Sequence, residues 1–219
     1  MIDFPKTPKN TVKRLHDRAS YDVKTIHSIL DAAFVCHVSF IRDGQPFIIP
    51  TLHARSGERL LLHGSQGSRL MQHIQAGQPV CIAVTILDGL VLARAVFNHS
   101  VNYRSVVLFG SGEKIDDLQE KTEALRLFTE KLVPGRWVET RPPNKKELNT
   151  TAIVSISIDS ASAKIRQGMP HDSDEDMDMS VWAGIIPVAE RYEDPQVDPD
   201  SRSNVQFPDY LHRLISETR

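Results

Sequence analysis

The sequence predicts a mainly β protein with flanking helices, in which short antiparallel strands form a barrel. Apolar residues recur in short segments, and turn signals such as Arg-Asp-Gly at 42–44 and Ser-Gly at 56–57 separate them. Only a few segments show helical periodicity. With 219 residues, the chain is long enough for one sizeable domain that buries a substantial core.

The first half of the chain predicts a helix, a strand meander and a second, short helix. Asp22 is a candidate cap for the first helix, because the apolar residues between positions 23 and 30 then lie on one helical face. The short helix starts near Ser68 and ends at Gly77. The strands of the meander are expected at 34–41, 45–54 and 59–63.

The second half predicts a hairpin, a long strand, an amphipathic helix and a closing strand. The Asp-Gly pair at 88–89 is the expected hairpin turn, between strands 79–87 and 90–95. A capping box at 116–119 opens the helix, and the Pro-Gly pair at 134–135 ends it. The remaining expected elements are a strand over 105–115, a closing strand over 150–159 and a short helix within 209–219.

The loss of periodicity after position 167 divides the chain into three parts. We expect an N-terminal arm over 1–20, one domain over 21–190 and a C-terminal tail over 191–219 that carries the short helix. An acidic run from Asp172 to Asp178 is interpreted as a solvated loop, because it lacks the glycine and glutamate of a calcium-binding loop.

The composition excludes several classes of partner. The 26 basic and 28 acidic residues nearly balance, so no strong positive field is expected to attract nucleic acid or an anionic membrane. Cys36 and Cys81 each lie in an apolar run, which is typical of buried thiols in a reducing compartment. No apolar segment is long enough to span a membrane. We therefore expect a soluble, cytoplasmic protein.

The segment from Leu60 to Leu70 is the strongest local indication of a binding site. An apolar strand runs through a glycine-rich turn into a helix, so that the amides of turn 64–68 and the helix dipole would face an anion. Arg69 adds a charge that can bind phosphate through two hydrogen bonds. An ordinary strand-to-helix turn with a capping serine remains the alternative.

The histidines give no convincing metal site. His53, His63 and His73 recur every ten residues, which fits ligand spacing on neither a strand nor a helix. Arg94 and His99 either line a substrate entrance or are ordinary surface residues. We therefore predict no metal site.

Three stretches together resemble the pyridoxamine 5'-phosphate oxidase-like flavoproteins, the FMN-binding split barrels. They are the turn 60–70, the run 92–107 (Leu-Ala-Arg-Ala-Val-Phe-Asn-His-Ser-Val-Asn-Tyr-Arg-Ser-Val-Val) and the ending from 164–170 through 182–184. The most similar branch is that of flavin-nucleotide-binding proteins, which includes nitroimidazole-resistance-type reductases. The resemblance implies an antiparallel split β-barrel and a homodimer with FMN between its subunits.

The resemblance also implies which residues bind the cofactor. The strand before the turn would present its backbone to the flavin ring, at Ile49, Pro50, Thr51 and Leu52. The turn would hold the phosphate, through His63, Gly64, Ser65, Ser68 and Arg69. The long strand would reach the flavin across the dimer with Tyr103, Arg104 and Ser105, and Trp182 would cover the ring.

Departures from the family pattern limit what the resemblance implies about the reaction. The oxidases proper carry basic residues at the positions of Ile48, His53 and Leu70, so the resemblance implies weaker phosphate binding in this chain. The residues with which the oxidases hold pyridoxamine phosphate have no counterpart in the C-terminal loop. We therefore expect a flavin-dependent oxidoreductase for another small molecule, with NAD(P)H as a candidate reductant and no assigned catalytic residue. The alternatives are a carrier or sensor that binds flavin, haem or deazaflavin without catalysis, and a barrel that has lost its cofactor.

Overall fold

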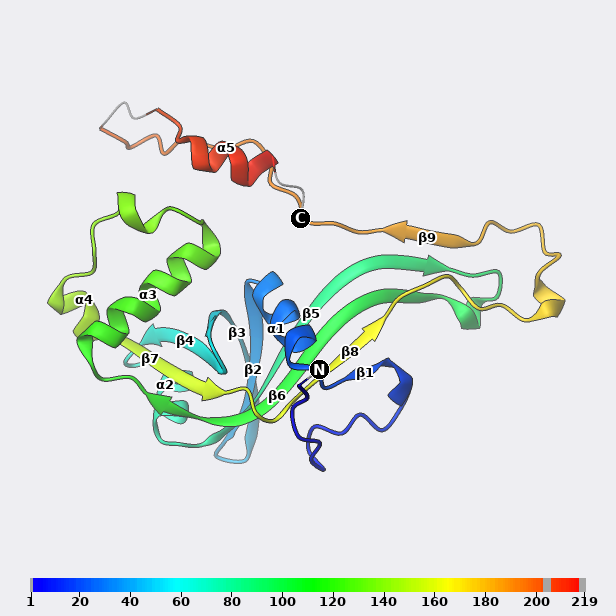
Figure 1. Cartoon of the computed structure of the whole chain (residues 1–219), viewed down its shortest axis with the longest axis horizontal. Helices are drawn as coiled ribbons and strands as arrows, with labels where there is room; N and C mark the ends of the chain where they lie inside the picture. The colour runs from blue at the N-terminus through cyan, green and yellow to red at the C-terminus, as the bar shows by residue number, and fades with distance from the viewer. Residues whose placement is uncertain (1, 203–205, 217–219) are drawn as a thin grey trace.

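The computed structural model describes residues 2–202 and 206–216, and most of its strands form one antiparallel barrel. Within these residues, the strands β6–β7–β4–β3–β2–β5 form a ring, which closes because β5 also pairs with β6. Strand β8 pairs with β6, β1 pairs with β8, and β9 pairs with β5. Figure 1 shows α1, α2 and α3 around the barrel, with β5 and β6 running far out to one side. The predicted fold class is therefore confirmed.

The bounds of the elements follow the chain order. The strands are β1 (Ala19–Ser20), β2 (Val35–Arg42), β3 (Gln45–Ser56), β4 (Arg59–Ser65), β5 (Pro79–Leu92), β6 (Ser100–Lys114), β7 (Thr151–Ser157), β8 (Ala161–Arg166) and β9 (Gly184–Pro187). The helices are α1 (Val23–Ala32), α2 (Arg69–Gln75), α3 (Leu118–Leu132), α4 (Lys145–Thr150) and α5 (Asp209–Ser216), with short 3₁₀ turns η1 (His16–Arg18), η2 (Val96–Asn98), η3 (Trp137–Glu139) and η4 (Asp174–Asp176).

Two apolar clusters position these elements. The larger one fills the barrel beneath α1 and α2, with Ile26, Leu62 and Ile74 fully buried in it. The smaller one lies on the other side of β3 and β4, where Phe128 of α3 packs near Leu61. Helix α2 is thus fixed against the barrel, with its first residue at the end of β4.

Local signals predicted most elements correctly. Asp22 caps α1 by accepting a hydrogen bond from the Thr25 amide. The β2–β3 hairpin turns at Asp43 and Gly44, which both have positive φ, as the favoured two-residue turn requires. The cap of α3 is Asp117 rather than Asp116, since its carboxylate accepts from the Gln119 and Glu120 amides.

The predicted hairpin around positions 88–89 is wrong. Strand β5 continues through these residues with only a register shift, and it pairs with β6 on one side and β9 on the other. Gly89 is needed for close approach: a Cβ there would lie 3.1 Å from the Ile186 carbonyl oxygen and from the Ile185 side chain. Strands β8 and β9, which the periodicity did not indicate, lie in the region beyond the predicted closing strand.

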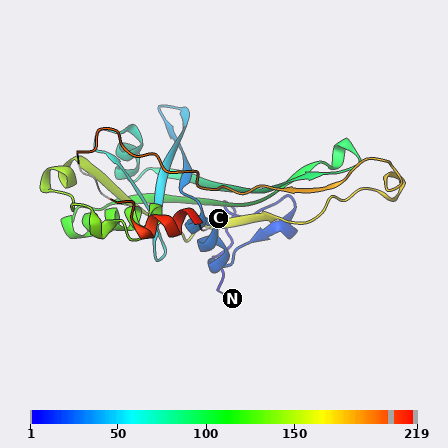
Figure 2. The ribbon, with the colours of Figure 1, turned by 90° about the horizontal axis from the view of Figure 1, so that it is seen from above.

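The outer halves of β5 and β6, with β9 alongside, form a projecting arm (Figure 2). Its outer end holds η2 and the loop that leads to β9. From β9 the chain returns across the body to α5. There, Tyr210 donates to Glu139 and accepts from Arg136, so the predicted C-terminal helix is present over its described part. No helix in the described ranges is long and apolar enough to cross a membrane.

Candidate functional site

A split between β3 and β4 forms the centre of the candidate site. These strands pair only from His53 opposite Leu62 to Ser56 opposite Arg59. Beyond that point, β3 pairs with β2 on its other edge, and β4 pairs with β7. Among the described strands, none pairs with the second edge of β3 over 45–52. This edge includes Ile49, Pro50, Thr51 and Leu52, so backbone groups are available where the sequence places a flavin ring.

The glycine-rich turn lies at the end of β4, but its amides are not free. The Gln66 amide donates to the Thr150 carbonyl at 3.3 Å, and the Ser68 amide donates to the Ser65 carbonyl at 2.9 Å. The Gly67 amide donates to Ser65 Oγ at 3.3 Å. The expectation that these three amides point at an anion is therefore wrong, because Ser65 of the turn and the Thr150 carbonyl already accept from them.

Arg69 is the cationic group of the turn. It is the first residue of α2, and Ser68 at the N-cap position makes no side-chain cap bond. The Arg69 guanidinium carbon lies 4.6 Å from the centroid of the Phe47 ring on β3. Phe47 stacks in turn on Phe40, with centroids 5.3 Å apart. The arginine thus reaches across from α2 to the strand that forms the opposite wall of the split.

His63 occupies the wall of the site beneath α3. Its ring packs edge-on against Phe128, with centroids 4.3 Å apart. Its Nδ1 atom is buried and has no hydrogen-bond partner. Burial lowers the pKa of His63, which favours the neutral imidazole. Next to it, Gly64 approaches α2 so closely that a Cβ would lie 3.1 Å from Met71 Cγ.

Tyr103, Arg104 and Ser105 lie on β6, apart from the split. Measured around the barrel wall, β6 is three strand spacings from β3, through β2 and β5, a path of about 14 Å. Arg104 donates from Nη2 to Asp88 Oδ1 at 2.7 Å, and this bond raises its pKa. The pair lines a groove of about 910 Å³ whose other walls include His37 and, from the segment after β9, Glu190.

Trp182 lies on the projecting arm, far from the turn of its own chain. It comes two residues before Gly184, which pairs with Leu92 at the outer end of β5. Strand β5 begins at Pro79, just after α2, so Trp182 is displaced from α2 by about 40 Å along β5. Its side chain is 64% exposed. The structure therefore does not bring Trp182 to the turn within one chain.

Arg94 and His99 also lie on the arm. Arg94 forms an ion pair with Asp172, and His99 Nδ1 lies 3.1 Å from the Ala95 carbonyl oxygen. The sequence predicted that Asp172 belongs to a solvated loop, and this is wrong for that residue, because its side chain is only 1% exposed. Both residues of the predicted substrate entrance thus have structural partners at the arm.

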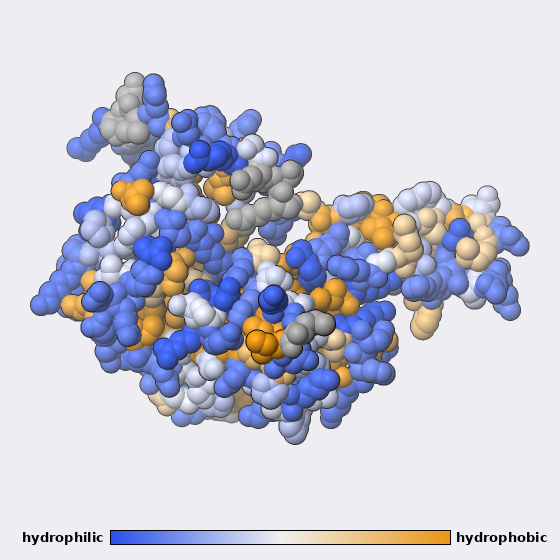
Figure 3. Space-filling view, in the orientation of Figure 1, coloured by the Kyte–Doolittle hydropathy of each residue, from blue (hydrophilic) through white to orange (hydrophobic). Residues whose placement is uncertain are grey.

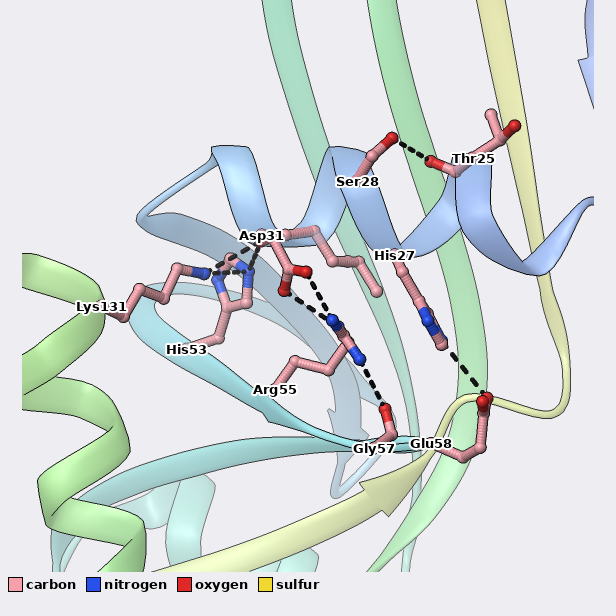
Figure 4. A network of polar contacts seen from close by, with 10 residues as sticks. Thr25, His27, Ser28, Asp31, His53, Arg55, Gly57, Glu58 and Lys131 are labelled. Atoms are coloured by element: carbon pink, nitrogen blue, oxygen red, sulfur yellow. Dashed lines mark hydrogen bonds and ion pairs between the residues drawn. The ribbon is translucent and has the colours of Figure 1, made fainter. Parts of the chain in front are cut away.

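A buried polar cluster behind β3 is a feature that sequence analysis did not identify (Figure 4). His53 Nε2 lies 2.8 Å from the Leu30 carbonyl oxygen at the end of α1 and 3.0 Å from Lys131 Nζ. Lys131 donates to the same carbonyl at 2.9 Å. Burial and the lysine charge lower the pKa of His53 to about 4. Only the tertiary fold brings these groups together, from three separate elements.

Comparison with known proteins gives one family and several similar structures. The family model described as pyridoxamine 5'-phosphate oxidase matches residues 22–165. No curated protein sequence matches the chain.

Two solved structures are similar over nearly their whole length. The flavocytochrome Anf3 from Azotobacter vinelandii is 40% identical, with a TM-score of 0.89, over 95% of this chain and 97% of that one. The FAD and heme binding protein from Mycobacterium smegmatis is 34% identical, with a TM-score of 0.86, over 90% and 97%. A putative 5-nitroimidazole antibiotic resistance protein from Bacteroides thetaiotaomicron shares the fold, at 21% identity and a TM-score of 0.57, over 67% and 86%.

Proposed function

Since this chain belongs to the pyridoxamine 5'-phosphate oxidase family, whose fold binds flavin, we propose that it is a flavin-dependent oxidoreductase that acts on a small molecule. The split beside Arg69 is the observation that carries this proposal. The open edge of β3 offers backbone groups to a flavin ring, and Arg69 offers a charge to its phosphate. The flavin supplies hydride and electron transfer when bound, and the chain's residues bind and orient it.

The site fits both FMN, which the resemblance implies, and FAD, because both contain the ring, ribityl chain and first phosphate that the split and Arg69 would hold. Similarity to the FAD and heme binding protein from Mycobacterium smegmatis favours FAD in this chain. We therefore propose a flavin nucleotide at this site, with FAD favoured over FMN.

The same comparisons support haem as a second cofactor, and His63 would hold its iron. Haem iron takes a neutral imidazole, and burial holds His63 in that form with Nδ1 unpartnered. His37 is the alternative, because it is exposed and lines the groove beside Arg104. The Arg104 guanidinium is a candidate partner for a carboxylate of the haem. We propose His63 and use His37 as the matched control.

The outer face of the barrel supports a homodimer with the flavin at its interface. Cross-strand neighbours line up on this face: Ile48, Ser39, Cys81 and Phe109 form one row. A second row contains Pro50, His37, Ala83 and Val107. Exposed aliphatic side chains border the rows, at Val35, Ile41 and Leu87. Such a surface is typical of one that a second subunit covers.

The positions that differ from the oxidases leave the flavin phosphate with fewer basic partners than in those enzymes. Leu70 is buried in the barrel core, and His53 is bonded behind β3, so neither extends a basic group into the split. We propose the cytoplasm as the compartment, because Cys36 and Cys81 are free thiols. NAD(P)H is the proposed reductant.

Absorption spectra of the purified protein test this function. We expect flavin bands, a haem Soret band, and loss of the flavin bands when NAD(P)H is added without oxygen. His63→Ala should remove the haem bands, whereas His37→Ala should retain them. A colourless protein that takes up no added flavin would contradict the proposal. Bound flavin that NAD(P)H does not reduce, while dithionite does, would favour the carrier or sensor instead.

A further inference from the structure

The outer end of the arm is a built structure rather than a loose loop. We call residues 94–99 and 169–182 the arm tip. Asp172 joins its two segments: its carboxylate accepts from the Arg94 amide at 2.9 Å, the Ala95 amide at 3.3 Å and Asn98 Nδ2 at 3.1 Å. These bonds fix the positions of the side chains that the tip carries.

The arm tip exposes many apolar side chains. Phe97 is 96% exposed at the end of the β5–β6 connection. Orange and tan residues lie along the projecting arm in Figure 3. The exposed apolar residues of the tip are Val96, Phe97, Met169, Met177, Met179, Val181 and Trp182. A concentration of apolar and aromatic residues on a projecting element is typical of an interaction surface.

The charge of the tip indicates what kind of surface it fits. The segment 171–182 has five acidic residues and no lysine or arginine. A partner surface should therefore be basic and should offer apolar groups to Phe97 and its neighbours. The acidic charge disfavours an anionic membrane as the partner.

The N-terminal segment 2–18 of this same chain has the complementary properties. It has five lysine and arginine residues and two acidic ones. Among the basic residues, Leu15 is 42% exposed and adopts φ 53°, a left-handed conformation that is strained for leucine. The segment thus presents an exposed apolar side chain within a basic surface.

The two surfaces do not meet within one chain. Strand β1, which follows the N-terminal segment, pairs with β8 at Lys164, and Lys164 pairs with Ser105 on β6. The tip begins at His99, which is six residues or about 20 Å further along β6. The N-terminal segment therefore lies at the root of the arm, and its complement lies at the outer end.

We propose that the arm tip docks onto the N-terminal segment of a second copy of this chain. A two-fold axis that places two arms side by side in opposite directions brings each tip to the root of the other arm. The contact then pairs acidic residues 174–178 with the basic segment, and Phe97 with Leu15. The inference rests on the homodimer in the proposed function and identifies a contact outside the flavin site.

A charge-reversal cycle tests the electrostatic part. Glu175→Lys with Asp178→Lys reverses the tip, and Lys9→Glu with Lys13→Glu reverses the N-terminal segment; all four side chains are exposed. In sedimentation equilibrium at low salt, we expect each double variant to weaken the dimer about tenfold or more. The combined quadruple variant should recover to within about threefold of the wild-type dissociation constant. Glu113→Lys with Asp159→Lys, two exposed acidic residues away from the arm, should change nothing.

Leu15→Gly tests the apolar part, because glycine adopts the same positive φ without strain. We expect a weaker dimer with little change in thermal stability of the monomer. If the wild type is a dimer and none of these variants changes its dissociation constant, the docking contact is overturned. A monomeric wild-type protein that binds flavin would overturn the homodimer itself, and flavin titration of each variant keeps the two outcomes apart.

Discussion

The guanidinium of Arg69 lies over the ring of Phe47, 4.6 Å from its centroid, and so connects α2 to β3 across the split of the barrel. The contact places the proposed phosphate ligand beside the backbone edge that would hold the flavin ring. It also holds a long side chain that would otherwise be mobile, which lowers the entropy cost of binding an anion.

Phe47→Leu should separate this positioning from the binding itself. We expect a loss of about 1 kcal/mol in unfolding free energy, because the ring contacts with Phe40 and Arg69 are both removed. Flavin affinity should fall by less than it does in Arg69→Ala, since the charge remains. Urea denaturation and a flavin titration measure the two effects, and an equal or larger loss of affinity would contradict the assigned roles.

Gly112 on β6 allows α2 to approach the barrel. A Cβ at this position would overlap Ile74 Cγ2, so Gly112→Ala should displace α2 and the turn before it. We expect a loss of roughly 1–3 kcal/mol in unfolding free energy, together with weaker flavin binding. Gly67→Ala is the control for stability, because the nearest atom there is 3.9 Å away. Unchanged stability of Gly112→Ala would show that α2 packs differently.

His53 should make stability depend on pH. Its pKa is about 4 in the folded protein and near 6.5 when unfolded, so the unfolded chain binds more protons between these values. The stabilising contribution is complete above pH 6.5 and is lost as the pH falls toward 4, by up to about 3 kcal/mol. Urea denaturation of His53→Leu should show a flatter dependence over this range, whereas His171→Leu should match the wild type. Parallel curves for both variants would refute the role of His53.

Trp182 can cover a flavin only if that flavin is held partly by another subunit, given its place on the arm. In a Trp137→Phe background, FMN or FAD should quench the emission of Trp182 in the dimer and not in protein diluted to monomer. Trp182→Ala should also shift the flavin redox potential and leave phosphate binding intact. Unchanged emission on flavin binding in the dimer would limit Trp182 to a structural role at the arm tip.

The sequence predicted the elements whose signals are local. The cap at Asp22 and the turn at Asp43 and Gly44 act within a few residues, and both are confirmed. The Asp88–Gly89 pair was misinterpreted as a turn because its partners are distant: Arg104 binds Asp88, and β9 packs against Gly89. Asp172 was assigned to a solvated loop for the same reason, since the amides that it binds lie 77 and 78 positions away.

The candidate site could be predicted only in part. Residues 49–52 and the turn up to Arg69 border the same split, since one short hairpin joins them, and their binding of a cofactor stays a prediction. The protein's own bonds to the turn amides could not be predicted, because Thr150 is brought there by β7 pairing with β4. Tyr103 to Ser105 and Trp182 lie elsewhere in the chain, and their proposed roles depend on a second subunit.

Titration of the cofactor-free protein with FMN, FAD and riboflavin, for the wild type and for Arg69→Ala, tests the central claim most directly. A charge-assisted bond to phosphate contributes roughly 1.5–3 kcal/mol, so Arg69→Ala should weaken both nucleotides about tenfold or more. Riboflavin, which has no phosphate, should bind equally well to both proteins. Equal losses for all three ligands, or no loss for any, would contradict the assignment of the flavin to this split.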